Sequence, residues 1–382
     1  MSVTVPKGFR AAGVPAGLKD AGRDLALVVN DGPQAAAAAV FTANRVKAAP
    51  VIWSEQVLAG GQVRAVVLNA KYANACTGAA GFQISHATAE AVAEALGVGA
   101  GEVAVCSTGK IGEPPPLDLL VAGVAAAVAT LSGEGGGDAA DAIRTTDTVS
   151  KQAAAVRDGW SVGGMAKGAG MLAPALATML CVLTTDAAAD PAALDRALRS
   201  ATSLTFDRID SDGCMSTNDT VLLLASGASG MTPSQADLDA AVFEVCASLA
   251  RQLVADAEGA SKDIEIEIRG AATEQDALEV ARAVSRSNLL KCALHGEDPN
   301  WGRILAAVGT TDAAFDPLVL DAAINGVWVC RDSAPGEDPA KVDMSAREVS
   351  LVVDLKAGSH SATIWSNDLT AAYVHENSAY ST

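Results

Sequence analysis

Residues 167–180 read Lys-Gly-Ala-Gly-Met-Leu-Ala-Pro-Ala-Leu-Ala-Thr-Met-Leu, and this stretch joins a Gly- and Pro-containing loop to the start of an apolar strand. Thr178 follows the small residue Ala177 and precedes the apolar run Met179–Leu183. Such a loop can hold a peptide bond bent and accessible, while the strand keeps the hydroxyl-bearing residue in one place. A threonine hydroxyl that faces the carbonyl carbon before it can cleave its own chain, and the released α-amine can then act as the base for that hydroxyl. The stretch therefore predicts a self-processed enzyme in which Thr178 is the nucleophile.

Two further features set this Ala-Thr pair apart from an ordinary strand threonine. Lys167 places one charge at the mouth of an otherwise uncharged loop, where an anionic substrate can dock. Cys106-Ser107-Thr108-Gly109 reads as a strand end that turns at a glycine. Its hydroxyl and backbone N–H groups suit an oxyanion hole, in which removing one donor typically lowers the rate about 10²–10³-fold. Each feature alone has a purely structural explanation, since a Ser-Thr-Gly turn is usually only a turn.

Cofactor and metal motifs are not matched. Residues 168–173 fit the loose dinucleotide pattern G-x-G-x-x-A, but that pattern requires a helix after it and Pro174 blocks one. The histidines show no metal-ligand spacing; they are His86, His295, His360 and His375. We therefore expect neither a metal nor an organic cofactor.

The composition excludes several classes of partner. The chain has 382 residues and a formal net charge of -18, with 45 acidic against 27 basic residues. This charge disfavours nucleic acid and anionic membrane surfaces, which need basic patches, while small zwitterionic substrates remain compatible. The seven scattered cysteines include no Cys-x-x-Cys pair and read as reduced thiols, and the N-terminus lacks an apolar signal segment. We expect a cytoplasmic protein.

Apolar runs and turn residues predict a layered fold. The strands expected are residues 63–68, 103–106, 178–184, 220–224, 264–268 and 349–355. Helices are expected to start at Ser85, Asp190-Pro191, Thr232-Pro233 and Thr273, with Gly97 ending the first. Strands and helices interleave without a regular βαβ rhythm, so we expect an α/β or α+β layered fold rather than a doubly wound sheet.

Short motifs along the whole chain resemble the ornithine acetyltransferase (ArgJ) family of arginine biosynthesis. In the first half they are Pro6-Lys7-Gly8-Phe9, Phe41-Thr42-Ala43-Asn44, Asn74-Ala75-Cys76-Thr77-Gly78, Ser107-Thr108-Gly109, Thr145-Thr146-Asp147-Thr148 and Gly163-Gly164-Met165-Ala166-Lys167-Gly168. From there on they are Ala177-Thr178-Met179-Leu180, Ser216-Thr217-Asn218-Asp219-Thr220, Glu258-Gly259-Ala260-Ser261-Lys262, Asp298-Pro299-Asn300-Trp301-Gly302-Arg303 and Asn377. One departure is Lys110, which stands where the family usually has an apolar residue.

The resemblance implies an α/β fold, a layered N-terminal-nucleophile-like sandwich, cleaved between Ala177 and Thr178. The products would be an α chain (1–177) and a β chain (178–382), the latter with a smaller C-terminal α+β lobe from about residue 240, associated as a dimer of αβ units. Thr178 would carry the acetyl group, and Thr108 and Gly109 would form the oxyanion hole. The positions that match the family's substrate contacts are Thr145, Lys167, Thr178, Glu258, Asn377 and Thr382.

The activity implied is acetyl transfer from N-acetylornithine to glutamate through an acetyl-Thr178 ester, which the resemblance leaves open to acetyl-CoA as a further donor. The alternative is a self-processed N-terminal-nucleophile amidohydrolase or aminopeptidase, in which water replaces glutamate. A second alternative is an uncleaved amino-acid-binding protein with an inert Thr178.

Overall fold

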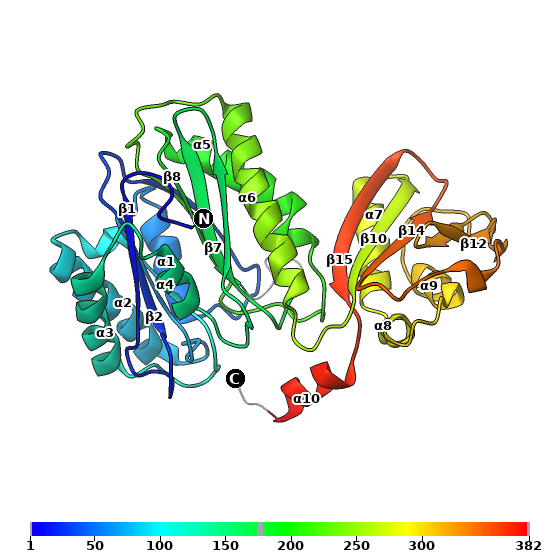
Figure 1. The fold of residues 1–382 in the computed structure, drawn as a ribbon, viewed down its shortest axis with the longest axis horizontal. Helices are drawn as coiled ribbons and strands as arrows, with labels where there is room; N and C mark the ends of the chain where they lie inside the picture. The colour runs from blue at the N-terminus through cyan, green and yellow to red at the C-terminus, as the bar shows by residue number, and fades with distance from the viewer. Residues whose placement is uncertain (1, 174–178, 380–382) are drawn as a thin grey trace.

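Two β-sheets stacked face to face form the larger part of the computed structural model, which describes residues 2–173 and 179–379 (Figure 1). The first sheet has the order β1 (Phe9–Val14), β2 (Leu25–Asn30), β4 (Ala65–Asn69), β5 (Val103–Ser107). The second has the order β3 (Ala36–Phe41), β9 (Thr220–Ala225), β8 (Leu180–Thr185), β7 (Ser161–Lys167), β6 (Lys151–Val156). β8 and β9 run parallel, with Leu180 paired to Thr220.

Helices cover the outer face of each sheet and complete four layers. α2 (Gly78–Leu96) and α3 (Leu117–Thr130) pack on the first sheet, and α5 (Pro191–Leu204) and α6 (Gln235–Ala255) pack on the second. α1 (Ala49–Leu58), α4 (Gly136–Ala142) and the short turns η1 (Ala100–Glu102) and η2 (Phe206–Arg208) connect these layers.

Strand β8 shows why the central apolar runs are continuous. Leu180 and Val182 lie in the core between the two sheets, while Cys181 and Leu183 lie in the core under α5 and α6. Because side chains alternate between faces and both faces are covered, every position of the strand has to be apolar or hydrogen-bonded. The prediction that residues 220–224 are buried on both faces is confirmed by β9.

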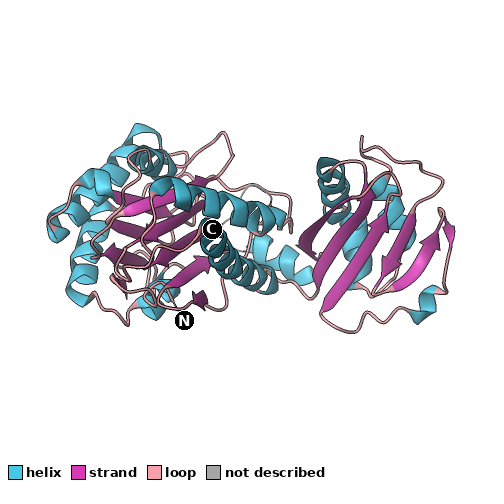
Figure 2. Ribbon diagram, turned by 90° about the horizontal axis from the view of Figure 1, so that it is seen from above, coloured by secondary structure: helices cyan, strands magenta, loops and turns pink. Residues whose placement is uncertain are grey.

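The C-terminal lobe is a six-stranded sheet with helices on one face (Figure 2). Its strands, in spatial order, are β13 (Ala334–Pro335), β12 (Val327–Arg331), β11 (Asp321–Ile324), β14 (Glu348–Asp354), β10 (Asp263–Ala271) and β15 (His360–Asn367). The helical segments are α7 (Glu274–Ser285), α8 (Asn288–His295), α9 (Trp301–Val308) and η3 (Pro339–Lys341). The lobe boundary expected near residue 240 falls within α6, which packs on the sandwich; the first strand of the lobe begins at Asp263.

The last helix leaves the lobe and returns toward the sandwich (Figure 1). α10 (Ala371–Ala379) follows β15, and the Thr370 hydroxyl donates to the Gly259 carbonyl at 2.6 Å. Gly259 has φ 61°, and a Cβ there would lie 2.3 Å from the Tyr373 backbone nitrogen. Only glycine allows this close packing, which fixes the direction of the tail.

The layered α/β fold predicted from the sequence is confirmed, and so are the N-caps Asp190 and Thr273 and the stop at Gly97. The predicted start at Ser85 is wrong, because α2 begins at Gly78 and the Ser85 hydroxyl accepts a hydrogen bond from Asn74 inside the helix. The helix expected to open at Thr232-Pro233 is capped instead by Ser234. No helix of the described ranges is both long and apolar enough to cross a membrane.

Candidate functional site

A cavity of about 100 Å³ lies where the ends of β5 and β7, the segment before β9 and the tail helix α10 meet. Its lining includes six of the residues predicted from the sequence: Thr108, Gly109, Thr145, Lys167, Glu258 and Asn377. The other predicted positions, Ala177, Thr178 and Thr382, lie outside the described residues. The structure therefore brings together side chains from positions 108 to 377 of the chain, while their roles remain predictions.

The turn after β5 presents one free backbone donor. The Thr108 N–H donates to the Asn69 carbonyl at 3.0 Å, so Thr108 can offer only its hydroxyl hydrogen. The Gly109 N–H has no acceptor among the described residues. Gly109 has φ 127°, and a Cβ would lie 2.3 Å from the Lys71 carbonyl group. Glycine is thus required both by the backbone angle and by the neighbouring chain.

Lys167 ends β7 with a buried ammonium group. Its Nζ donates to the Thr108 hydroxyl at 3.2 Å and lies 3.9 Å from Asp147 Oδ2. Burial lowers the pKa of Lys167, and nearby Asp147 counteracts this shift. The structure thus holds the Lys167 amino group close to the Thr108 hydroxyl.

Asp147 lies next to Lys167 and accepts hydrogen bonds from three other residues. Its Oδ1 accepts from Lys151 Nζ at 2.6 Å and from the Gly168 N–H at 2.6 Å, and its Oδ2 accepts from the Thr145 N–H at 3.0 Å. Burial would raise the pKa of Asp147, but Lys167 and Lys151 together with these hydrogen bonds hold it well below its usual value. An ionised Asp147 therefore fixes Thr145 and the start of the 168–173 loop relative to Lys167.

Glu258 and Asn377 form the far side of the cavity. The Asn377 Nδ2 donates to Glu258 Oε2 at 3.0 Å, which ties α10 to the loop after α6. The Glu258 N–H donates to the Ala169 carbonyl at 2.8 Å. A Cβ on Gly170 would lie 2.4 Å from Glu258 Oε2, so a larger residue there would have to displace this carboxylate.

The segment before β9 supplies lining residues that the sequence analysis quoted in a motif but gave no role. Ser216, Thr217 and Asn218 line the cavity, and Asn218 Nδ2 donates to the carbonyls of Ala73 and Ser107 at 2.6 and 2.8 Å. Next to them, Asp219 Oδ1 accepts the Met179 N–H at 3.0 Å. The sequence signal for this segment was the Ser216–Thr220 motif alone, since its contacts span distant parts of the chain.

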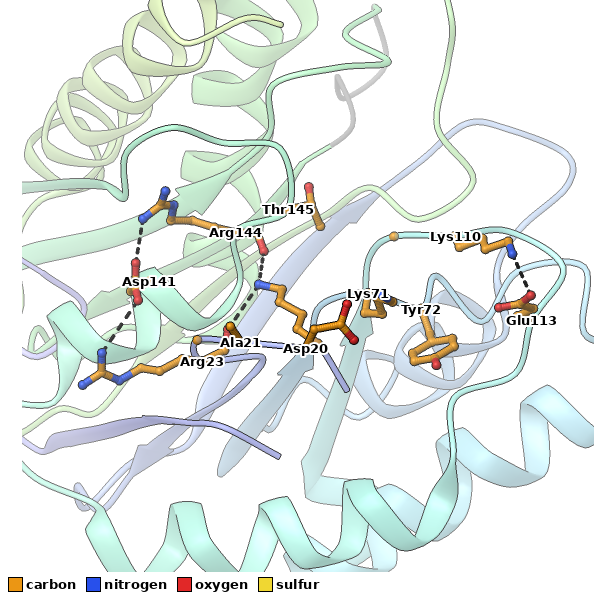
Figure 3. Close-up of a pocket in the computed structure, with 13 residues that line it drawn as sticks. Asp20, Ala21, Arg23, Lys71, Tyr72, Lys110, Glu113, Asp141, Arg144 and Thr145 are labelled. Carbon is orange, nitrogen blue, oxygen red and sulfur yellow. Dashed lines mark hydrogen bonds and ion pairs between the residues drawn. The ribbon is translucent and has the colours of Figure 1, made fainter. Parts of the chain in front are cut away.

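A larger pocket of about 450 Å³ adjoins the cavity and shares Gly109 and Thr145 with it (Figure 3). Its charged lining residues are Lys19, Arg23, Lys71, Lys110 and Arg144 against Asp20, Glu113 and Asp141. Figure 3 shows Asp141 between Arg23 and Arg144, and Lys110 paired with Glu113 at 2.7 Å. The Lys71 ammonium has no hydrogen-bond or ion-pair partner among the described residues. This outer pocket is locally basic in an acidic protein.

Comparison with known proteins finds relatives of this chain in one family. The model of the ArgJ family matches residues 10–382. The arginine biosynthesis bifunctional protein ArgJ of Streptomyces avermitilis is 67% identical over 382 residues, covering 100% of both chains. The ArgJ protein of Mycobacterium tuberculosis is 59% identical over 388 residues, covering 99% of this chain and 96% of its own. A solved ornithine acetyltransferase complexed with ornithine, also from M. tuberculosis, is 59% identical, with a TM-score of 0.45 over 47% of this chain and 96% of its own.

Proposed function

Because this chain belongs to the ArgJ family, we infer that it is an acetyltransferase of arginine biosynthesis that moves the acetyl group of N2-acetylornithine to glutamate. The products are ornithine and N-acetylglutamate. The observation that carries this proposal is the single cavity lined by six predicted residues, at the end of the sheet in which Met179 leads into β8.

The nucleophile proposed is Thr178, exposed as a new N-terminus by cleavage after Ala177. This cleavage gives the α chain 1–177 and the β chain 178–382, which stay associated as a dimer of αβ units. A free α-amine has a pKa of about 7.7–8.0, close to neutral pH, and so suits a general base for the adjacent hydroxyl. The hydroxyl oxygen attacks the acetyl carbonyl, ornithine leaves, and the glutamate amine then attacks the acetyl ester.

The oxyanion of each tetrahedral intermediate is held by Gly109 and Thr108 in this proposal. The Gly109 N–H is the free backbone donor of the turn, and Thr108 contributes its hydroxyl because its own N–H is bonded to Asn69. The nearby Lys167 ammonium adds positive potential at the same place. Such fixed dipoles can stabilise the developing charge without reorganising.

Substrate orientation is assigned to the two sides of the cavity. Lys167 anchors the α-carboxylate that N-acetylornithine and glutamate share. Glu258 receives the side-chain ammonium of ornithine, with Asn377 holding that carboxylate in place. Thr145 and Thr382 complete the substrate contacts.

We also propose that acetyl-CoA serves as a second acetyl donor through the outer pocket. That pocket is over four times the volume of the inner cavity, meets it at Gly109, and carries the unpaired Lys71 for an anionic donor. The test is Lys71→Glu against Lys7→Glu, the same charge change at an exposed lysine outside the pocket. Lys71→Glu is expected to lower acetyl-CoA-dependent N-acetylglutamate formation about tenfold or more, while transfer from N-acetylornithine stays unchanged. Equal loss of both reactions, or of neither, contradicts this donor site.

The main activity is tested by denaturing intact mass before and after incubation with N-acetylornithine. Two chains split between Ala177 and Thr178, with one acetyl group on the fragment that begins at Thr178, support the transferase. Acetyl release that is as fast in water as with glutamate indicates an amidohydrolase instead. A single unlabelled chain leaves the binding-protein alternative.

A further inference from the structure

Asp219 is a fully buried aspartate directly before β9, beside the residue that follows Thr178. Its Oδ1 accepts the Met179 N–H at 3.0 Å, and the Thr220 N–H donates to the Met179 carbonyl at 3.2 Å. The N–H of the peptide bond that joins Thr178 to Met179 is therefore held by this carboxyl group.

The second oxygen of this carboxyl group is unsatisfied. Asp219 Oδ2 is buried and has no hydrogen-bond partner among the described residues. A buried polar atom left unpaired destabilises the fold, so such atoms are rare unless they serve a reaction or bind a group. Burial also raises the pKa of Asp219 well above its usual value, against the opposing effects of the Met179 amide, the Ser216 hydroxyl and Lys167. The neutral carboxylic acid, which can donate a proton, is thus favoured.

The hydrogen bond to Asp219 is made one residue along the chain from the predicted cleavage point. Backbone nitrogens of adjacent residues are no more than about 4 Å apart. Asp219 Oδ1 accepts the N–H of Met179, and the nitrogen that cleavage must release belongs to the residue directly before it in the chain, Thr178. A leaving amide nitrogen needs a proton, and a carboxylic acid bonded to the next residue of the chain can supply one.

We propose that Asp219 carries the proton that self-cleavage requires, an inference that rests on the proposed cleavage between Ala177 and Thr178. The Thr178 hydroxyl oxygen forms a bond to the Ala177 carbonyl carbon, and the bond from that carbon to the Thr178 nitrogen breaks. The carboxyl group gives its proton to the leaving nitrogen and takes the hydroxyl proton in its place. The net result is an ester with a free amine, and Asp219 is regenerated. One water then hydrolyses the ester, leaving the Ala177 carboxylate and the free hydroxyl of Thr178.

The experiment follows cleavage of the full-length chain as it is made. Pulse-labelled cell-free translation followed by a chase gives the rate at which the 382-residue product becomes two fragments on a denaturing gel. Asp219→Asn keeps the shape and an acceptor for the Met179 N–H but cannot exchange the proton. We expect cleavage at least 100-fold slower than in the wild type, within the range of about 10²–10⁴ typical of general acid–base catalysis.

Asp210 offers a closely matched control. It is also fully buried, has an unpaired oxygen and a pKa raised by burial, but its Oδ2 pairs with Arg286 Nε at 2.8 Å rather than with the strand after Thr178. Asp210→Asn should therefore cleave within about threefold of the wild-type rate. Thermal unfolding of the purified variants shows whether each one has folded.

The outcomes separate this inference from the proposed function. If the wild type cleaves, Thr178→Ala does not, and Asp219→Asn is blocked while still unfolding cooperatively near the wild-type temperature, the inference stands. Cleavage of Asp219→Asn within tenfold of wild type overturns the role of Asp219 alone. If Asp219→Asn does not fold, Asp219→Glu is the deciding variant. It keeps a titratable carboxyl group, so the proposal requires it to cleave at a measurable rate. A folded but uncleaved Asp219→Glu overturns the proposal. An uncleaved wild type overturns the proposed processing itself.

Discussion

Gly109→Ala tests the oxyanion hole at the position where the backbone leaves no room for a side chain. An added Cβ would lie 2.3 Å from both the carbonyl carbon and the carbonyl oxygen of Lys71, and φ of 127° strains any other residue. The turn must then move by about 1 Å to restore an ordinary contact distance, which takes the Gly109 N–H out of line with a developing oxyanion. Losing one such donor costs about 2.7–4 kcal/mol of transition-state stabilisation, so we expect kcat to fall about 10²–10³-fold.

Gly112→Ala is the matched control for backbone strain. Gly112 also has a positive φ, 89°, but no atom lies within 4 Å of an added Cβ. Both variants pay the cost of an unfavourable backbone angle, about 1–3 kcal/mol of stability. The assay is steady-state acetyl transfer from N-acetylornithine to glutamate, normalised to the cleaved fraction seen by intact mass. A kcat for Gly109→Ala within threefold of that of Gly112→Ala would refute the assignment of this N–H to the oxyanion hole.

The remaining predictions concern the lysines and the loop around the cavity. Lys167→Met should lower kcat/KM for N-acetylornithine by about tenfold to a hundredfold, since a hydrogen bond to a charged group contributes about 1.5–3 kcal/mol; unchanged steady-state kinetics would exclude it as the carboxylate anchor. Gly170→Ala should push the flexible Glu258 carboxylate away from Asn377 and lower kcat/KM about tenfold, with little change in melting temperature. A crystal structure of this variant with the hydrogen bond from Asn377 to Glu258 intact would contradict the prediction. Burial lowers the pKa of Lys291 from 10.5 to about 8. Between pH 8 and pH 10.5 the unfolded chain therefore binds more protons than the folded protein, so the free energy of unfolding increases as the pH rises through this range. Denaturant unfolding should show a gain of up to about 3 kcal/mol between pH 8 and 10.5 that Lys291→Met lacks, and parallel curves for the two proteins would contradict the shift.

The strands that the sequence identified are those whose periodicity is set by large apolar side chains. β10 alternates Ile and Glu, and its isoleucines lie in the core of the C-terminal lobe while its glutamates face away. β1, β3 and β6 were missed because they read as alanine-rich segments, which local propensity assigns to helices. These strands are extended because neighbouring strands and the opposite sheet bury them closely, and such tertiary contacts override propensity.

The candidate site was also predictable only in part, because tertiary contacts that the sequence does not show bring its residues together. Thr108 and Lys167 were picked out from the residues around them and Glu258 from the family resemblance, and both kinds of evidence carry residue identity but no geometry. The supporting group Asp147 received no role, although it stands two residues from Thr145, because its importance comes from binding Lys151, Gly168 and Thr145 at once. A linear motif contains no signal for a residue of this kind, since the partners of Asp147 are brought together only by folding.

The charges around the cavity explain how a strongly acidic chain can hold a neutral substrate. Asp147 stays ionised beside Lys151 and Lys167, whereas burial raises the pKa of Asp219 well above its usual value. Two buried lysines and the ionised Asp147 therefore lie on the side of the cavity near Thr108 and Gly109, and the Glu258 carboxylate stands at the opposite side. N-acetylornithine carries a carboxylate at one end and an ammonium at the other, so it fits this polarity with its charges paired at both ends. Glutamate has a carboxylate at the end of its side chain where ornithine has an ammonium, and this second carboxylate is repelled by Glu258. The same polarity thus favours ornithine over glutamate when Thr178 carries no acetyl group. Glu258→Gln should therefore weaken inhibition by ornithine, while glutamate should bind equally well or more tightly.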